Sequence, residues 1–139
     1  MAHVGLLEDN AIIARLAATM LNHVGHTVTI YERPSLCLEA LNLLEQRRLT
    51  PRFHSPRILE LPFELLILDL HLPEVGGLHI LELLRTHAHT SKLPLVFCTA
   101  ATERELDLAF RLAPHASLVE KPFKMETLVS AVSSALRPN

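Results

Sequence analysis

LLILDLHLPEVGGL, residues 65–78, is the stretch of sequence that decides the fold. A near-continuous apolar run extends from Phe63 to Leu68 and ends at Asp69, which is typical of a strand buried on both faces of a parallel sheet. Gly76-Gly77 then predicts a turn, and a helical repeat begins at Leu78. The stretch therefore predicts one strand, a polar residue at its end, and one helix.

The same unit recurs on both sides of this stretch. The predicted strands are 4–7, 28–31, 63–68, 95–98 and 118–119. The first predicted helix follows Asn10, which can cap it, and the second begins at Pro34; the others cover 78–84, 102–113 and 125–136. This alternation predicts an α/β fold, a flavodoxin-like (βα)5 three-layer sandwich with a parallel sheet in the order 2-1-3-4-5.

Apolar residues mark one face of the predicted helices. In the first helix they recur at spacings of three and four: Ile12, Ile13, Leu16, Met20 and Val24. Gly25 is expected to end this helix. We interpret the recurring leucines of each helix as core residues.

Length and composition narrow the class of protein. The 139 residues suit a single domain covering 1–139. A net charge of −2 gives no general attraction to nucleic acid or to an anionic membrane. No apolar run approaches the roughly 20 residues that span a bilayer, and the N-terminus does not have the pattern of a signal peptide. Cys37 and Cys98 lack the spacing of metal ligands, so we expect free thiols in a cytoplasmic protein.

One segment does not follow the alternating pattern. Residues 49–62 contain three prolines, have no clear period, and are long for a connection inside a compact domain. The basic cluster of the chain lies in or just before this segment: Arg47, Arg48, Arg52 and Arg57. We expect an extended loop, for which a solvated surface segment and a partner-docking segment are both open interpretations.

Polar residues follow the predicted strands at the edge where doubly wound sheets bind ligands. Glu8 and Asp9 follow the first strand, Asp69 the third, Thr99 the fourth and Lys121 the fifth. Each alone has an ordinary explanation, since Asp favours turns, Thr favours strands and Lys is usually solvated. Their convergence on one edge predicts a functional site.

The residue types at this edge suit phosphoryl transfer. Three converging carboxylates repel one another unless a cation neutralises them, and carboxylate and carbonyl oxygens suit Mg²⁺. Asp69 could attack a phosphoryl group as a carboxylate nucleophile and form an acyl phosphate. Mg²⁺ and Lys121 would balance the charge of the phosphoryl oxygens, and the Thr99 hydroxyl would donate a hydrogen bond to one of them.

The sequence closely resembles the receiver domains of response regulators from residue 4 to residue 136. The resemblance rests on the motifs LLEDN (6–10), LLILDLHLPEVGGL (65–78), VFCTA (96–100) and VEKPF (119–123), and on the family's usual steps from Asp69 to Thr99 and from Thr99 to Lys121. It implies that Asp69 accepts phosphate from a histidine kinase or phosphotransfer protein in a two-component system. It also implies no enzyme activity beyond the domain's own phosphotransfer and autodephosphorylation.

The resemblance implies roles for individual residues as well. Asp9 and Asp69 would ligate Mg²⁺ directly, Glu8 would act through water, and the backbone carbonyl of His71 would complete the protein ligands. Lys121–Pro122 would be a cis peptide bond, which X-Pro bonds tolerate at low cost.

Two further positions, and several departures from the family pattern, bear on regulation. His71 and Ala101 stand where family members tune dephosphorylation; the other interpretation of His71 is an exposed imidazole that contributes only its carbonyl. Leu118 replaces the aromatic residue that commonly reports the state of Thr99. Pro114-His115-Ala116 stands where a Gly is usual, and Gly76 replaces a frequent acidic residue.

Three other functions fit this sequence less well. The alternative within the family is a degenerate receiver that binds partners without phosphorylation, but such chains usually lose the Asp, the Lys or the acidic pair. A haloacid dehalogenase-type phosphatase would carry its nucleophile in a DxD after the first strand, and a nucleotide- or flavin-binding domain would need a Gly-rich loop there. We therefore expect a receiver domain that is a monomer or weak dimer, has a downstream effector of unknown kind, and contacts neither nucleic acid nor membrane.

Overall fold

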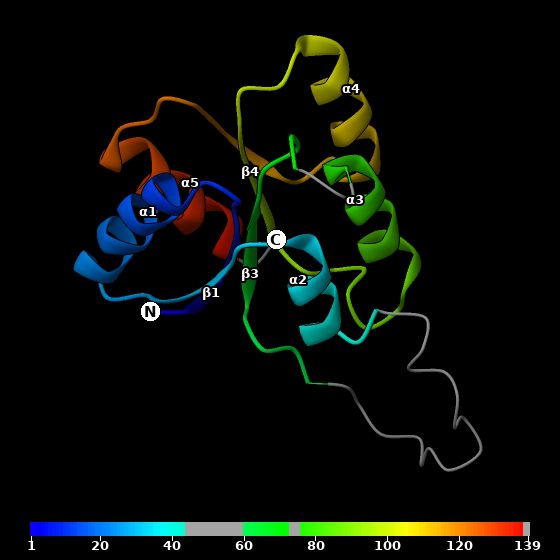
Figure 1. Ribbon diagram of the computed structural model, residues 1–139, viewed down its shortest axis with the longest axis horizontal. Helices are drawn as coiled ribbons and strands as arrows, with labels where there is room; N and C mark the ends of the chain where they lie inside the picture. Colours follow the sequence, from blue (N-terminus) through cyan, green and yellow to red (C-terminus); the bar gives the residue numbers. More distant parts are fainter. Residues whose placement is uncertain (44–59, 73–75, 138–139) are drawn as a thin grey trace.

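The predicted parallel sheet is present (Figure 1), and its strands have the predicted order. The computed structural model describes residues 1–43, 60–72 and 76–137. The sheet runs β2-β1-β3-β4-β5. Its strands are β1 (His3–Leu7), β2 (Thr27–Tyr31), β3 (Leu65–Leu68), β4 (Leu95–Thr99) and β5 (Ser117–Glu120). The helices are α1 (Ala11–His23), α2 (Pro34–Ala40), α3 (Gly77–Thr86), α4 (Glu103–Leu112) and α5 (Met125–Leu136).

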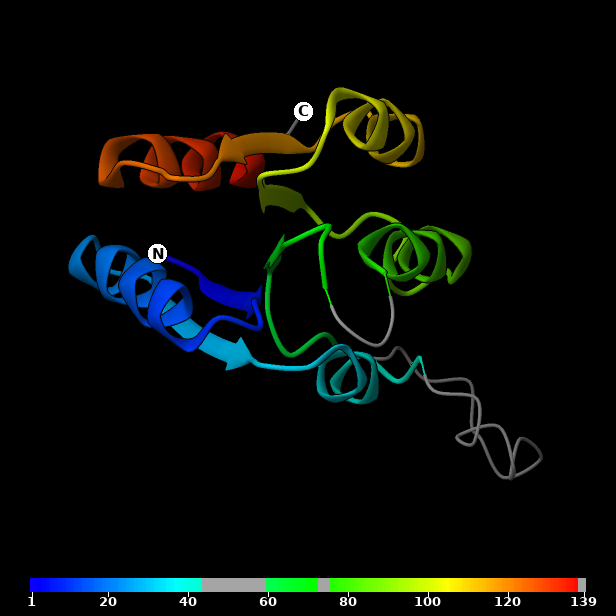
Figure 2. The ribbon, with the colours of Figure 1, turned by 45° about the horizontal axis from the view of Figure 1, so that its top comes forward.

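Helices cover both faces of the sheet. Helices α1 and α5 lie on one face and α2, α3 and α4 on the other (Figure 2). Side chains of β3 alternate between the two layers, so Leu65 and Ile67 join the α1/α5 core while Leu66 and Leu68 join the α2/α3/α4 core. All four residues are fully buried, which explains why this strand is a continuous apolar run in the sequence.

Asn10, Gly25 and Pro34 mark helix boundaries as predicted, and the structure adds a cap at Thr102. The Asn10 side chain accepts hydrogen bonds from the first free amides of α1, at 3.0 and 3.1 Å. Gly25, with φ of +99°, follows the end of α1 in a conformation that other residues rarely adopt. Pro34 occupies the first turn of α2, and Thr102 caps α4 in a capping box with Glu105.

The predicted apolar face of α1 is correct for Met20, which packs against the α1/α5 core, and wrong for Ile12, Leu16 and Val24, which are exposed. The residues of α1 buried against the sheet are Ala14, Ala17, Ala18 and Leu21. Ile12 is instead 80% exposed and Leu16 48% exposed. The alanines form a parallel stripe whose small side chains let the helix lie close to the sheet, and the period of the large residues alone did not reveal it. Leu36 and Leu108 are exposed too, so not every helical leucine belongs to the core.

The start of β3 also differs from the prediction. The strand begins at Leu65, and Phe63 precedes it as a buried residue outside the sheet ladder. The Phe63 ring packs against β1 at Gly5, where an added Cβ would lie 2.6 Å from the ring. It also contacts Tyr31 edge-on, with 5.8 Å between ring centroids. Phe63 therefore fills the α2/α3/α4 core beside the start of β3.

Three other expectations concern the remaining chain. Of the extended loop expected at 49–62, residues 49–59 lie outside the described residues. Cys37 and Cys98 are free and buried, and burial raises the pKa of each thiol to about 12. Across the described ranges, no helix is both long and apolar enough to cross a membrane.

Candidate functional site

The parallel register brings four strand ends to one place. Leu7 at the end of β1 is level with Leu68 at the end of β3, so the residues after them, Glu8 and Asp69, are neighbours. At the other side, Thr99 pairs with the last residue of β5. The backbone N–H of Lys121 then donates to the Thr99 carbonyl at 3.1 Å. The sheet thus gathers the five residues that the sequence singled out.

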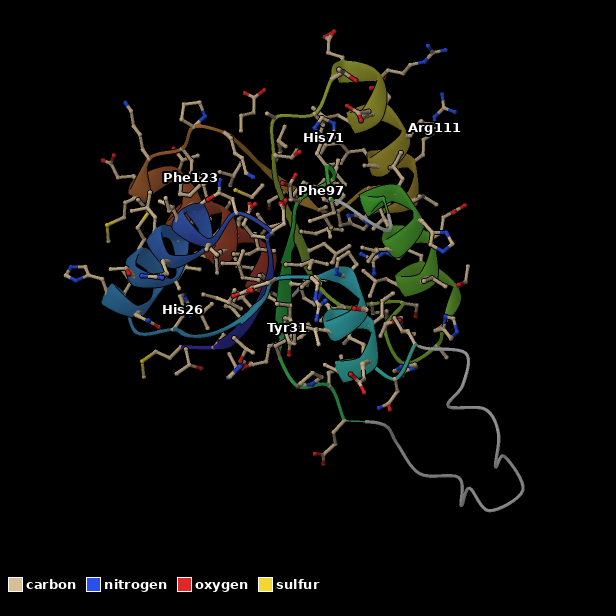
Figure 3. The ribbon with its side chains drawn as sticks, in the orientation of Figure 1. His26, Tyr31, His71, Phe97, Arg111 and Phe123 are labelled. Carbon is tan, nitrogen blue, oxygen red and sulfur yellow. The ribbon has the colours of Figure 1, made fainter. Side chains whose placement is uncertain are left out.

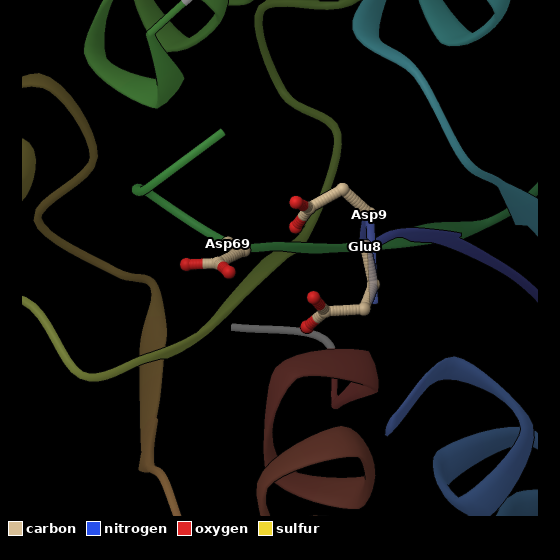
Figure 4. A group of neighbouring side chains, drawn as sticks. All are labelled: Glu8, Asp9 and Asp69. Atoms are coloured by element: carbon tan, nitrogen blue, oxygen red, sulfur yellow. The ribbon is translucent and has the colours of Figure 1, made fainter. Parts of the chain in front are cut away.

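Three carboxylates meet at this edge (Figure 4). One oxygen from each of Glu8, Asp9 and Asp69 lies within 4.8 Å of the others. Glu8 is 2% exposed and Asp69 is 5% exposed, whereas Asp9 faces solvent. Glu8 and Asp69 are therefore shielded from solvent, whereas Asp9 is exposed to it.

Lys121 bridges the two buried carboxylates. Its Nζ lies 2.6 Å from Glu8 Oε1 and 2.9 Å from Asp69 Oδ2. Burial alone would lower the pKa of Lys121, but the hydrogen bonds to Glu8 and Asp69 outweigh it and raise this pKa. Burial raises the pKa of Glu8, although Lys121 and the Asn10 N–H, 3.1 Å from Glu8 Oε2, both oppose that shift.

Hydrogen bonds within the segment that follows β3 fix the position of the Asp69 side chain. The backbone N–H of His71 donates to Asp69 Oδ1 at 3.0 Å, and the N–H of Gly77 donates to the Leu70 carbonyl at 3.2 Å. A Cβ on Gly77 would lie 2.5 Å from the Leu70 Cα and 2.8 Å from the Asp69 carbonyl oxygen. Glycine is therefore required here so that α3 can begin directly against the loop that carries Asp69. The peptide bond of Lys121–Pro122, on the other side of the site, is cis.

Thr99 contributes a buried hydroxyl to the site. The residue is 1% exposed, and its Oγ1 has no hydrogen-bond partner among the described residues. An unpartnered buried hydroxyl costs about 1–3 kcal/mol, so a ligand oxygen that accepted its hydrogen would be stabilised. Leu118 and Ala101, both half-buried, pack against the α2/α3/α4 core.

His71 makes a side-chain contact that the sequence reasoning missed. The residue lies between the end of β3 and α4 (Figure 3), and its Nε2 is 2.8 Å from both carboxylate oxygens of Glu105. The hydrogen bond from the Thr102 N–H and the contact with His71 lower the pKa of Glu105. The Thr102–Glu105 spacing of a capping box could have located this carboxylate at the start of α4, but not its contact with His71.

The carboxylates fit a hard divalent cation. Two oxygens bound to one octahedral Mg²⁺ lie about 3–4 Å apart, so oxygens within 4.8 Å of one another can ligate it after small side-chain movements. One ammonium group faces three carboxylates, which leaves a net charge of −2 that such a cation would neutralise. Both the donor atoms and the charge therefore suit Mg²⁺.

Comparison with known proteins identifies related sequences. The model of the response regulator receiver domain family matches residues 4–133. A probable transcriptional regulatory protein of Picosynechococcus sp. is 30% identical over 136 residues, which cover 98% of this chain and 49% of that protein. The polar-differentiation response regulator DivK of Brucella ovis is 25% identical, over 96% of this chain and 94% of its own length.

The fold is found again among solved structures. The Vibrio cholerae chemotaxis protein CheY4 superimposes with a TM-score of 0.76 at 19% identity, over 98% of this chain and 99% of that one. The chain spans about half the length of the first curated relatives that it matches, and nearly all of DivK.

Proposed function

This chain belongs to the response regulator receiver domain family, and we propose that it is a two-component switch operated by Mg²⁺-dependent phosphorylation of Asp69. A histidine kinase or a phosphotransfer protein would supply the phosphoryl group in the cytoplasm. The modified domain would then change its affinity for a downstream partner.

The observation that carries the proposal is the environment of Asp69. Its carboxylate is almost fully buried at the end of β3, yet it has both a cation, Lys121, and two further carboxylates beside it. A purely structural aspartate needs one partner, and here Lys121 would suffice. The additional acidic pair, Glu8 and Asp9, is costly without a second cation, which is what a site for Mg²⁺ and a phosphoryl group requires.

The transfer step uses the carboxylate of Asp69, the ammonium of Lys121 and the hydroxyl of Thr99. A carboxylate oxygen of Asp69 attacks the phosphorus of the donor, a new O–P bond forms, and the bond from phosphorus to the donor's leaving atom breaks with its electron pair remaining on the donor. The Lys121 Nζ, which lies 2.9 Å from Asp69 Oδ2, is close enough to bind a phosphoryl oxygen after a small movement. The Thr99 hydroxyl, which lacks a partner among the described residues, donates to one of them.

The carboxylate donors indicate what a bound Mg²⁺ would do. When bound, Mg²⁺ would neutralise phosphoryl and carboxylate oxygens together. Asp9 and Asp69 would hold it directly, Glu8 through water, and the His71 carbonyl would complete the protein ligands. Asp9 is exposed and so can change its position most readily when the cation binds.

The output is proposed to depend on a partner protein. Leu118 has no ring with which to follow a movement of Thr99, so the common aromatic signal between site and surface is missing. The exposed charges on α4 find few counterparts on α5, and exposed ion pairs contribute only about 0–1 kcal/mol each. We therefore propose a monomer or weak dimer that a downstream effector recognises in its phosphorylated form.

Acetyl phosphate tests the proposal directly. With Mg²⁺ present, intact-protein mass spectrometry should show one added phosphate on the wild type and none on Asp69→Asn. The chain has three aspartates, and Asp107 on α4 is exposed, so Asp107→Asn is a matched control that should label like the wild type.

The same experiment separates the proposal from its alternative. No labelling of the wild type by acetyl phosphate, together with no binding of beryllofluoride, would favour a receiver that binds partners without phosphorylation. Equal labelling of Asp69→Asn would show that the phosphoacceptor is another residue.

A further inference from the structure

A polar cavity lies at the opposite end of the sheet from Asp69. It has a volume of about 580 Å³ and is lined by the first residues of β4 and β5, Leu95 and Ser117, and by the last turns of α3, α4 and α5. The site described above is at the other ends of the same strands. The two sites are therefore separated by the length of the sheet.

The lining of this cavity is basic. It includes Arg85, Lys92 and Arg137, together with His115, and contains no aspartate or glutamate among the described residues. No carboxylate of a described residue forms an ion pair with any of these cations. Positive charge is thus concentrated here in a chain whose net charge is −2.

Arg85 is the most constrained of these cations. It is half-buried, and it donates to the backbone carbonyls of Thr90, Ser91 and Leu93, which fix its position on the cavity wall. Burial lowers the pKa of its guanidinium because the charged form loses hydration. Its Nε–H and one Nη2 hydrogen have no protein acceptor among the described residues and are available to a ligand.

The ends of three helices work against an anion but do not outweigh the cations. Each helix C-terminus carries about half a negative charge, and α3, α4 and α5 all end at this cavity. Three full positive charges exceed that total. The hydroxyls of Ser117 and Ser134, which form no hydrogen bond with the described residues, add neutral donors. The balance therefore favours an anion with several oxygen acceptors.

We propose that this cavity binds a small organic phosphate. A guanidinium held in a fixed orientation suits the oxygens of a phosphate group, and Lys92 and Arg137, which also line the cavity, would add charge. Pro94 and Leu112, two half-buried residues of the wall, provide an apolar surface for the organic part of the ligand. The volume lies within the range of about 300–1,000 Å³ that small-molecule sites occupy.

The test is an NMR titration of the full chain carrying Asp69→Asn, without Mg²⁺, so that binding at the acidic site does not interfere. The probes are adenosine 5′-monophosphate, inorganic phosphate and adenosine. Millimolar adenosine 5′-monophosphate should shift the backbone signals of Ser91, Lys92 and Ser117 and the Nε–H signal of Arg85, and adenosine should not. Inorganic phosphate should shift the same signals with weaker affinity if the apolar wall contributes.

Charge-reversal variants assign the binding to the cavity. Lys92→Glu with Arg137→Glu should weaken binding about tenfold or more, because both exposed cations become repulsive. Arg33→Glu with Lys124→Glu, which changes two exposed cations at the other end of the sheet, should leave the affinity within about twofold because the distance exceeds the screening length.

Each outcome decides the proposal. No shift of the cavity signals at millimolar probe, or equal weakening by the two double variants, would overturn it. Equal binding of adenosine and adenosine 5′-monophosphate would overturn the assignment to a phosphate. None of these results depends on phosphorylation of Asp69, so failure here leaves the proposed function untouched.

Discussion

Replacing Lys121 with methionine should lower the free energy of unfolding, because Lys121 offsets the electrostatic cost of two buried carboxylates. Methionine preserves much of the apolar stem but removes the ammonium, which lies 2.6 Å from Glu8 and 2.9 Å from Asp69. The side chains of the two carboxylates are only 3% and 7% exposed, so water replaces the lost hydrogen bonds poorly. We expect the variant to retain the fold but to be markedly less stable.

The size of the loss follows from two effects. Breaking a buried ion pair costs about 3–5 kcal/mol, and each hydrogen bond to a charged group contributes about 1.5–3 kcal/mol. Protonation of Glu8 and the 15% exposure of the Lys121 side chain limit the loss, so we expect about 2–4 kcal/mol at neutral pH. In a chain of this size that corresponds to a decrease in melting temperature of roughly 6–12 °C.

The loss should depend on pH in a defined direction. Without Lys121 the pKa of Glu8, which burial already raises, should rise further. A carboxyl group whose pKa is higher in the folded state than in the unfolded state destabilises the fold as pH increases through the folded pKa. The variant should therefore recover stability on acidification toward the ordinary pKa of glutamate, and also on addition of Mg²⁺.

Urea unfolding of Lys121→Met and of Lys124→Met, an exposed lysine three residues further on, measures the effect. The control should stay within about 0.5 kcal/mol of the wild type. A Lys121→Met protein that is equally close to the wild type at neutral pH, or that becomes more stable as pH rises, would refute the argument that Lys121 compensates the buried carboxylates.

Three further predictions follow from the same site. Gly77→Ala should cost about 2–4 kcal/mol and slow labelling by acetyl phosphate, because its Cβ would lie 2.5 Å from backbone, whereas Gly76→Ala, with nothing within 4 Å, should be nearly neutral by urea unfolding. Millimolar Mg²⁺ should raise the melting temperature of the wild type, and Asp9→Asn should reduce that increase; no shift in the wild type and no binding by calorimetry would contradict a metal site. Light scattering with beryllofluoride and Mg²⁺ should show a mostly monomeric protein, and a stable dimer that charge reversal at Arg104 or Arg111 abolishes would contradict this.

Local patterns were sufficient for the order of elements and for the strand ends. The period of apolar residues distinguishes the buried run of β3 from the helical repeat of α3, and Asn10, Gly25 and Pro34 mark helix boundaries through short-range hydrogen bonds and backbone preferences. Because parallel strands align their carboxyl ends, the residues after them could be assigned to one edge before any contact was known. The acidic pair, Asp69, Thr99 and Lys121 were therefore predictable as a group.

The direction in which each side chain points within that group was not predictable. Glu8 and Asp9 are adjacent in the sequence, yet Glu8 is buried against Lys121 while Asp9 faces solvent. The contact of His71 with Glu105 joins residues 34 positions apart, and no local period links them. Such contacts arise only when the sheet has brought separate β–α units together.

The face that α1 presents to the sheet shows the same division. By itself, the sequence determined that residues 11–23 form an amphipathic helix, because helical period and capping are local properties. Only the tertiary structure decided that Ala14 and Ala17 face the sheet while Ile12 and Leu16 face solvent. The choice depends on how closely a helix can lie against its neighbours, and the helix's own residues do not specify the surface that they meet.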